Sequence, residues 1–152
     1  MSTTGLEVFD TTLQETNHWL KLMMRELNTG NRRLAFAALR ATLHALRDRI
    51  NPANAVHFGA QLPMLLRGAY YEGWRLAAPS HERHVDDFLI HVDANLPRSA
   101  QIGSDAAARA TFRVMTECVD AGEVDKLVRL LPSEIRCLWP DQLGEVELAL
   151  PF

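Results

Sequence analysis

Hydrophobic residues return at helical spacing along nearly the whole chain. Between residues 12 and 28 they recur at steps of three, four and seven, which places them on one face of a helix. Between residues 31 and 50 a second apolar stripe is flanked by alanines, which let a neighbouring helix approach closely. The pattern predicts two long, packed helices, and no strand pattern competes before the last residues of the chain.

Residues that begin and end helices lie between these stripes. Residues 12–15 match a capping box, and Gly30 is a typical helix stop. Asn51 is followed by a proline, a combination that favours an N-cap with proline in the first helical position. These signals predict a third helix over residues 52–61 and a fourth over residues 63–74.

The sequence aligns with itself without a gap when it is shifted by 69 positions. Residues 11–70 then share ten identities with residues 80–139, against about four expected from composition. The identical pairs are Leu20 and Leu89, Leu27 and Leu96, Ala37 and Ala106, Ala38 and Ala107, Arg40 and Arg109, Ala41 and Ala110, Thr42 and Thr111, Leu62 and Leu131, Pro63 and Pro132, and Arg67 and Arg136.

This self-similarity predicts an all-α protein in which two tandem pseudo-repeats of about four helices each pack into one compact helical body. The repeats span residues 11–75 and 80–140 of a single domain, and residues 141–152 form a C-terminal tail. The register fails near residues 97–104, which resemble a loop, so the second helix of the second repeat should begin late. Each repeat is small for a stable core, so the two should bury their apolar faces on each other.

One short stretch occurs in both repeats. Residues 61–74 (QLPMLLRGAYYEGW) and 130–140 (LLPSEIRCLWP) share a Leu-Pro pair, an arginine and a following aromatic. Because the feature is duplicated, we expect an architectural role for Leu62, Pro63, Arg67 and Tyr70. The Arg67 side chain is expected to donate to the free carbonyls of a nearby helix end. Tyr71 and Trp74 have no counterpart in the second repeat and are therefore candidate binding residues.

Three arginines recur every seven residues on the second predicted helix, at Arg33, Arg40 and Arg47. Such a basic ridge can bind phosphates or an acidic partner helix. The alternative is that these are surface arginines paired with acidic neighbours of the same chain, such as Asp48 and Glu26. Both interpretations stay open at the level of sequence.

The segment from residue 80 to 91 offers a candidate metal site. His84, Asp87 and His91 are spaced by three and four residues, so a helix would place them on one flank, and two imidazoles with a carboxylate suit zinc or iron. A closed site needs further ligands from another helix, and the sequence names none. The alternative is that both histidines face water at the edge of a core stripe.

Composition excludes several classes of protein. The 152 residues are 47% hydrophobic and 23% charged with a formal net charge of −3, which is globular and gives no general attraction to nucleic acid. No apolar run approaches the length of a membrane span, and no export signal precedes the first helix, so a cytoplasmic protein is expected. No nucleophile elbow, phosphate loop or dinucleotide motif is present, and no cofactor is predicted. Both cysteines, Cys118 and Cys137, are expected to be packed.

Three segments carry a resemblance to a known family: ALRATLHALRDRI, QLPMLLRGAYYEGW and GEVDKLVRLLPSEIRCLWP. Together they resemble the bacterial domain-of-unknown-function 2267 family, over roughly Phe9 to Pro140. The resemblance implies a small all-helical protein without an established activity, cofactor or partner, and it brings no catalytic residues with it.

Two hypotheses about function follow. The first is a non-catalytic protein-binding or assembly module, whose partner is an unknown protein or a second copy of the chain. The alternative is a metal-dependent enzyme that uses His84, Asp87 and His91.

Overall fold

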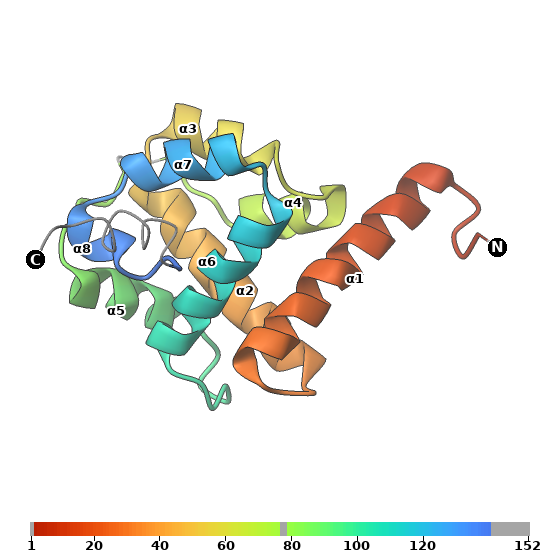
Figure 1. Cartoon of the computed structure of the whole chain (residues 1–152), viewed down its shortest axis with the longest axis horizontal. Coiled ribbons are helices and arrows are strands. Elements are labelled where there is room, and N and C mark those ends of the chain that lie inside the picture. Colours follow the sequence, from red (N-terminus) through yellow and green to blue (C-terminus); the bar gives the residue numbers. More distant parts are fainter. Residues whose placement is uncertain (1, 77–78, 141–152) are drawn as a thin grey trace, which may run out of the picture.

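The computed structural model describes residues 2–76 and 79–140, and this part of the chain is helical without strands. The helices are α1 (Glu7–Leu27), α2 (Arg32–Arg49), α3 (Pro52–Gly59), α4 (Met64–Tyr71), α5 (Val85–Asn95), α6 (Ser104–Cys118), α7 (Ala121–Arg129) and α8 (Ser133–Arg136). Their arrangement in Figure 1 confirms the all-α prediction. Residues 141–152, the predicted tail, lie outside the described residues.

Helix α2 lies at the centre of the body. It packs against α1, α4, α5 and α6, while α3 and α7 lie next to each other along one side of the body (Figure 1). Residues 41–47 of α2 are all buried, because α2 has neighbouring helices on several sides. Within the described residues, no helix combines the length and the hydropathy that crossing a bilayer requires.

Helix α1 begins earlier than the sequence predicted. Its N-cap is Leu6, and the helix runs without interruption through Thr12, the expected cap. The capping-box prediction is wrong because the Thr12 hydroxyl serves another helix: it accepts a hydrogen bond of 2.9 Å from the backbone N–H of Leu65 in the first turn of α4. The N-cap of α4 is Pro63, which has no side-chain acceptor of its own. The local pattern assigned Thr12 to the start of its own helix, but in the folded protein Thr12 caps the start of α4 instead.

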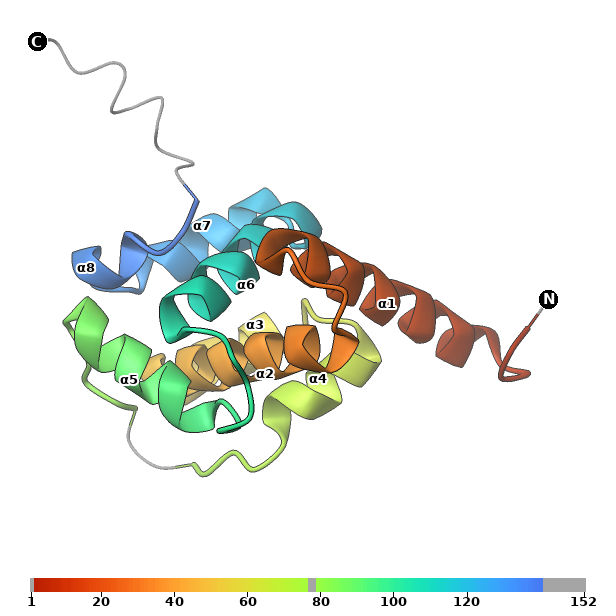
Figure 2. The same cartoon turned by 90° about the horizontal axis from the view of Figure 1, so that it is seen from below.

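The N-terminal half of α1 projects from the body, as Figures 1 and 2 both show. Thr12, Thr16 and Trp19 on its inner face are buried, whereas Val8 and Phe9, one to two turns before them, are 51% and 45% exposed. Residues separated by three or four positions share a helix face. The apolar stripe of α1 thus continues beyond the surface that covers it.

The ends of the next helices follow the sequence signals closely. Asn28 ends α1 in the left-handed conformation at φ 52°, two residues before the predicted stop at Gly30. The Asn31 side chain caps α2 by accepting from the N–H of Leu34, and the Asn51 side chain caps α3 by accepting from the N–H of Asn54. Helix α4 ends at Tyr71, so it is shorter than the predicted range.

Helix boundaries in the two predicted repeats correspond at the same shift of 69 positions. Helices α2 and α6 end at Arg49 and Cys118, α3 and α7 begin at Pro52 and Ala121, and α4 and α8 begin at Met64 and Ser133. Helix α6 begins late, at Ser104, as the loop over residues 97–104 predicted. The duplication itself stays a prediction.

The duplicated arginines make matching contacts. Arg67 donates from Nε to Gly59 O at 2.9 Å and from Nη2 to Ala60 O at 3.4 Å and Leu62 O at 2.8 Å. Arg136 donates from Nε to Leu131 O at 2.7 Å and from Nη2 to Arg129 O at 3.4 Å. Each guanidinium thus satisfies carbonyls at the end of the preceding helix, as the sequence predicted for Arg67.

Candidate functional site

The basic residues of α2 lie beside the carboxyl end of α4. Arg47 is buried, and its Nη1 donates to Tyr70 O at 2.8 Å and to Glu72 O at 3.1 Å, while its Nε pairs with Asp48 at 2.9 Å. The last carbonyls of a helix have no partner within the helix, and its carboxyl end attracts positive charge. Arg47 therefore completes α4 from outside and is not a surface arginine.

Two neighbours on α2 act on the same end of α4. His44 is buried, and burial lowers its pKa, so the neutral imidazole donates from Nε2 to Ala69 O at 2.8 Å. Arg40 forms an ion pair of 3.0 Å with Glu72. Arg33 is exposed and forms no ion pair with another described residue. The structure thus separates the predicted ridge into two residues that hold α4 and one that faces solvent.

Tyr71 and Trp74 stack on each other at the end of α4. Their ring centroids lie 5.7 Å apart, both rings are half-buried, and both pack against the core. The Tyr71 hydroxyl donates to Val56 O at 3.3 Å, and its ring passes so close to Gly59 that a Cβ there would lie 2.3 Å from the hydroxyl oxygen. The pair therefore joins α3 to α4 and exposes only part of each ring.

A cavity of about 430 Å³ lies beside Trp74 and is lined by candidate residues from three separate predictions. Trp74, Arg47 and His91 all line it, together with Asp48 and Asn95. Sequence reasoning placed these residues in separate sites, because their meeting depends on how residues 75–84 connect α4 to α5. The cavity is mixed in charge: Arg47 and His91 on its wall pair with carboxylates or carbonyls, whereas Arg75 forms no ion pair with another described residue.

His91 is held between two carboxylates. Its Nε2 lies 3.3 Å from Asp48 of α2, and its Nδ1 lies 2.8 Å from Glu82 in the segment before α5. Hydrogen bonds to Asp48 and then Glu82 raise the pKa of His91 to about 9, so the ring is positively charged at neutral pH. Burial would raise the pKa of Asp48, but the hydrogen bonds from His91 and Arg47 outweigh it, and the net shift is downward. The three side chains form an ion-paired clamp.

The predicted metal ligands do not converge. His84 is the N-cap residue of α5, where it pairs with Glu134 at 2.9 Å, while Asp87 is exposed and His91 belongs to the clamp. The carboxylates of the clamp lie on opposite ring nitrogens of His91 and cannot meet around one cation. Over residues 2–76 and 79–140, no group of three His, Cys, Asp or Glu residues is arranged to hold a metal ion. The metal hypothesis stays a prediction that nothing in this geometry supports.

The cysteines differ from each other. Cys118 is half-buried, and burial raises the pKa of its thiol to about 11, which keeps it protonated. Cys137 is exposed, so the expectation that it is packed is wrong; the neighbouring Leu138 and Trp139 occupy the core instead.

The family of the chain is settled by a comparison with family models. Residues 16–138 match the model described as an uncharacterized conserved protein (DUF2267). The chain belongs to this family. The match is narrower than the resemblance seen in the sequence, because it begins at Thr16 instead of near Phe9. No curated protein matches this DUF2267 chain.

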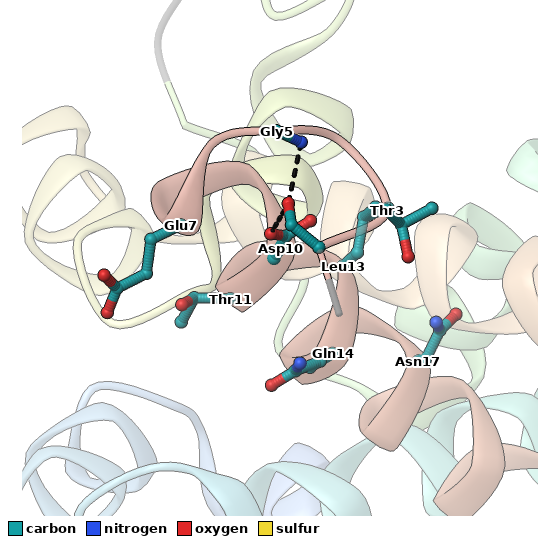
Figure 3. A pocket seen from close by; sticks show the side chains of 9 residues that line it. Thr3, Gly5, Glu7, Asp10, Thr11, Leu13, Gln14 and Asn17 are labelled. Atoms are coloured by element: carbon teal, nitrogen blue, oxygen red, sulfur yellow. Dashed lines mark hydrogen bonds between the residues drawn. The ribbon is translucent and has the colours of Figure 1, made fainter.

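Residues before the DUF2267 match line much of two hollows beside the projecting half of α1. One, of about 650 Å³, lies where residues 2–5 fold back over α1 (Figure 3). Asp10 closes this fold by accepting hydrogen bonds from Ser2 Oγ and from the backbone and hydroxyl of Thr4. The described lining contains two acids, Glu7 and Asp10, and no histidine, cysteine, lysine or arginine, and Asp10 is already held by these hydrogen bonds.

The second hollow lies between α1 and α4 and has a volume of about 430 Å³. Val8 and Met64 give it apolar walls, and Glu7 and Glu15 lie on its rim. Phe9 and Leu65, their sequence neighbours, are also exposed. We call the surface of Val8, Phe9, Met64 and Leu65, with the hollow, the α1–α4 shelf. Sequence reasoning missed it because the capping box placed the helix start after Phe9, although Val8 and Phe9 already had helical spacing to Thr12.

Proposed function

We propose that this DUF2267 protein is a non-catalytic protein-binding module and that it binds its partner on the α1–α4 shelf. The observation that supports the proposal is the apolar stripe of α1, which runs past the body onto Val8 and Phe9. Contiguous exposed apolar surface is uncommon on a monomer and marks interaction sites. A partner laid along the projecting half of α1 would cover the stripe and bury Met64 with it.

The shelf replaces Tyr71 and Trp74 as the place of binding in this proposal. Those rings are already engaged with each other, with Gly59 and with the core. Arg40 and Arg47 are engaged at the end of α4. The shelf residues on α1 precede the family match, so the proposed surface is a property of this chain and is not attributed to the family.

Photo-crosslinking in the cell of origin tests this proposal. A benzophenone amino acid is placed at position 9 on the shelf or at position 90 on α5, where Ile90 is an apolar control that is more exposed than Phe9. We expect one defined protein to crosslink from position 9 and not from position 90. The purified partner should then bind the full chain.

Paired variants complete this test. Val8→Ser with Met64→Ser should weaken binding of the purified partner at least about tenfold, whereas Ile90→Ser should leave it unchanged. Circular dichroism of each variant establishes that the helices are retained. Equal crosslinking from both positions, or unchanged affinity of a folded shelf variant, would refute the proposed function.

A further inference from the structure

The rim of the α1–α4 shelf is acidic and lacks a counter-charge. Glu7 and Glu15 line the hollow, and neither forms an ion pair with another described residue. Among residues 1–20 there is no lysine or arginine at all. Glu7 lies in the first turn of α1, where a carboxylate stabilises the helix end, but Glu15 lies two turns further on and lacks this local role.

From this charge pattern we infer that the partner on the shelf is a basic amphipathic helix of another protein, an inference that rests on the proposed function. Apolar side chains of that helix would enter the hollow beside Val8 and Met64. Its flanking lysines or arginines would pair with Glu7 and Glu15. An apolar groove between two helices is the surface that an amphipathic helix recognises through residues spaced by three and four.

Charge also argues against two other occupants of the shelf, a second copy of this chain and its own C-terminal segment. A second copy that pairs through the same surface would bring Glu7 and Glu15 of both chains together, and like charges across an interface oppose binding. The C-terminal segment of this chain, residues 141–152, carries Asp141, Glu145 and Glu147 and no lysine or arginine. Its apolar residues suit the shelf, but its charge does not.

Fluorescence anisotropy with designed peptides tests the inference on the full chain. The first peptide is an 18-residue helix with leucines along one face and lysines on both flanks, and the second has glutamates in place of the lysines. The third peptide is residues 141–152. At about 50 mM salt we expect the lysine peptide to bind at least tenfold tighter than either acidic peptide, and at about 500 mM salt this advantage should shrink strongly because salt screens exposed charges.

Matched charge variants locate the effect. Glu7→Gln with Glu15→Gln should weaken binding of the lysine peptide by about three- to tenfold, since each rim charge contributes a modest, screened interaction. Asp86→Asn with Asp93→Asn removes two exposed acids from α5 and should leave the affinity within about twofold. Val8→Ser with Met64→Ser should abolish binding of the lysine peptide while helicity is retained.

Four outcomes would overturn the inference. They are equal affinity for the lysine and glutamate peptides, tightest binding by residues 141–152, unchanged affinity after the rim substitutions, and a dimer in sedimentation that the Val8 and Met64 substitutions dissociate. If crosslinking from position 9 still identifies a partner, these outcomes reject only the basic helix. If no partner crosslinks from position 9, the proposed function itself is rejected.

Discussion

The helix pairs α3–α4 and α7–α8 occupy equivalent places at the 69-residue shift, yet they are built differently. In the first pair, α4 has eight residues, and the side chains of His44 and Arg47 from α2 satisfy its last carbonyls. In the second, α8 has four residues, and Arg109 of α6 donates to Cys137 O at 3.3 Å. Arg40 and Arg47 of the basic ridge of α2 are thus explained by the longer helix that they support.

The aromatic residues differ in the same way. Tyr70 is buried and donates its hydroxyl to Ala55 O at 2.7 Å, and beyond it Tyr71 and Trp74 continue the ring stack. At the equivalent place in the second pair, Trp139 stacks on Phe112 at 4.3 Å, and its buried indole N–H has no partner within the described residues. The hydroxyl of Tyr70 is thus hydrogen-bonded to the backbone, whereas Trp139 is held by stacking on Phe112.

The largest expected effect comes from removing the support of α4. Arg47→Ala leaves the carbonyls of Tyr70 and Glu72 without their donor inside the protein, so the free energy of unfolding should fall by about 3 kcal/mol. Thr116→Ala, at the equivalent position of α6, should cost under about 1 kcal/mol. Urea titration followed by circular dichroism measures both. Similar losses in the two variants would contradict the difference between the pairs.

The second-largest effect is expected at position 91 of α5, which differs from the equivalent position of α1. Position 91 holds a charged histidine in α5, whereas the equivalent position in α1 is the buried Leu22. The folded-state pKa of His91, about 9, lies above its unfolded value near 6.5, so its stabilisation is complete below about pH 6.5 and is lost as the pH rises through 9. We expect the free energy of unfolding to fall by about 2 to 3 kcal/mol over this window.

His91→Gln supplies the control for this pH dependence. Glutamine can still hydrogen-bond to Asp48 or Glu82 but does not titrate, so its stability should change far less between pH 6.5 and 9.5. Urea titrations of both proteins at one-unit intervals measure the difference. If the two pH profiles are parallel, the clamp does not stabilise the fold as the geometry indicates.

The smallest effect is expected from the contact between Gly59 and Tyr71, which only the α3–α4 pair has. Gly59→Ala should lower the free energy of unfolding by about 1 kcal/mol, because the new methyl meets the Tyr71 ring. In a Tyr71→Ala background the same change should cost clearly less, although the methyl still meets the buried Tyr70 ring at 3.0 Å. Gly68→Ala in α4 is the matched control: the methyl meets nothing within 4 Å, so stability should rise. A Gly59 cost that is unchanged without the Tyr71 ring would disprove the contact.

The sequence predicted the fold well because helix packing depends on repeating patterns. The apolar stripes and the cap at Asn51 act within a few residues, and the structure has them as expected. Thr12 shows the limit of such signals: a local motif was correct in chemistry, but its hydroxyl caps a helix 53 positions away. Whether a threonine caps its own helix or another depends on tertiary contacts.

The candidate sites were harder to predict because they depend on connections between helices. Glu82 reaches His91 only through the path of the chain before α5, so a metal set and an ion-paired clamp have the same appearance in sequence. Predicting the shelf would have required knowing at which residue α1 leaves the packed body. Val8 and Phe9 carried a helical signal, but spacing alone does not reveal whether a stripe is covered.

Gly59 of α3 and the Tyr71 ring of α4 lie so close together that side chains at these two positions compete for the same space. In the second pair the equivalent positions are Val128 and Pro140, so a side chain is present in place of the glycine and the aromatic ring is absent. Mutational drift at either position is therefore constrained by the other. A sequence that loses the ring at position 71 no longer requires glycine at position 59. A sequence that first gains a bulky side chain at position 59 must lose the ring or move the helix.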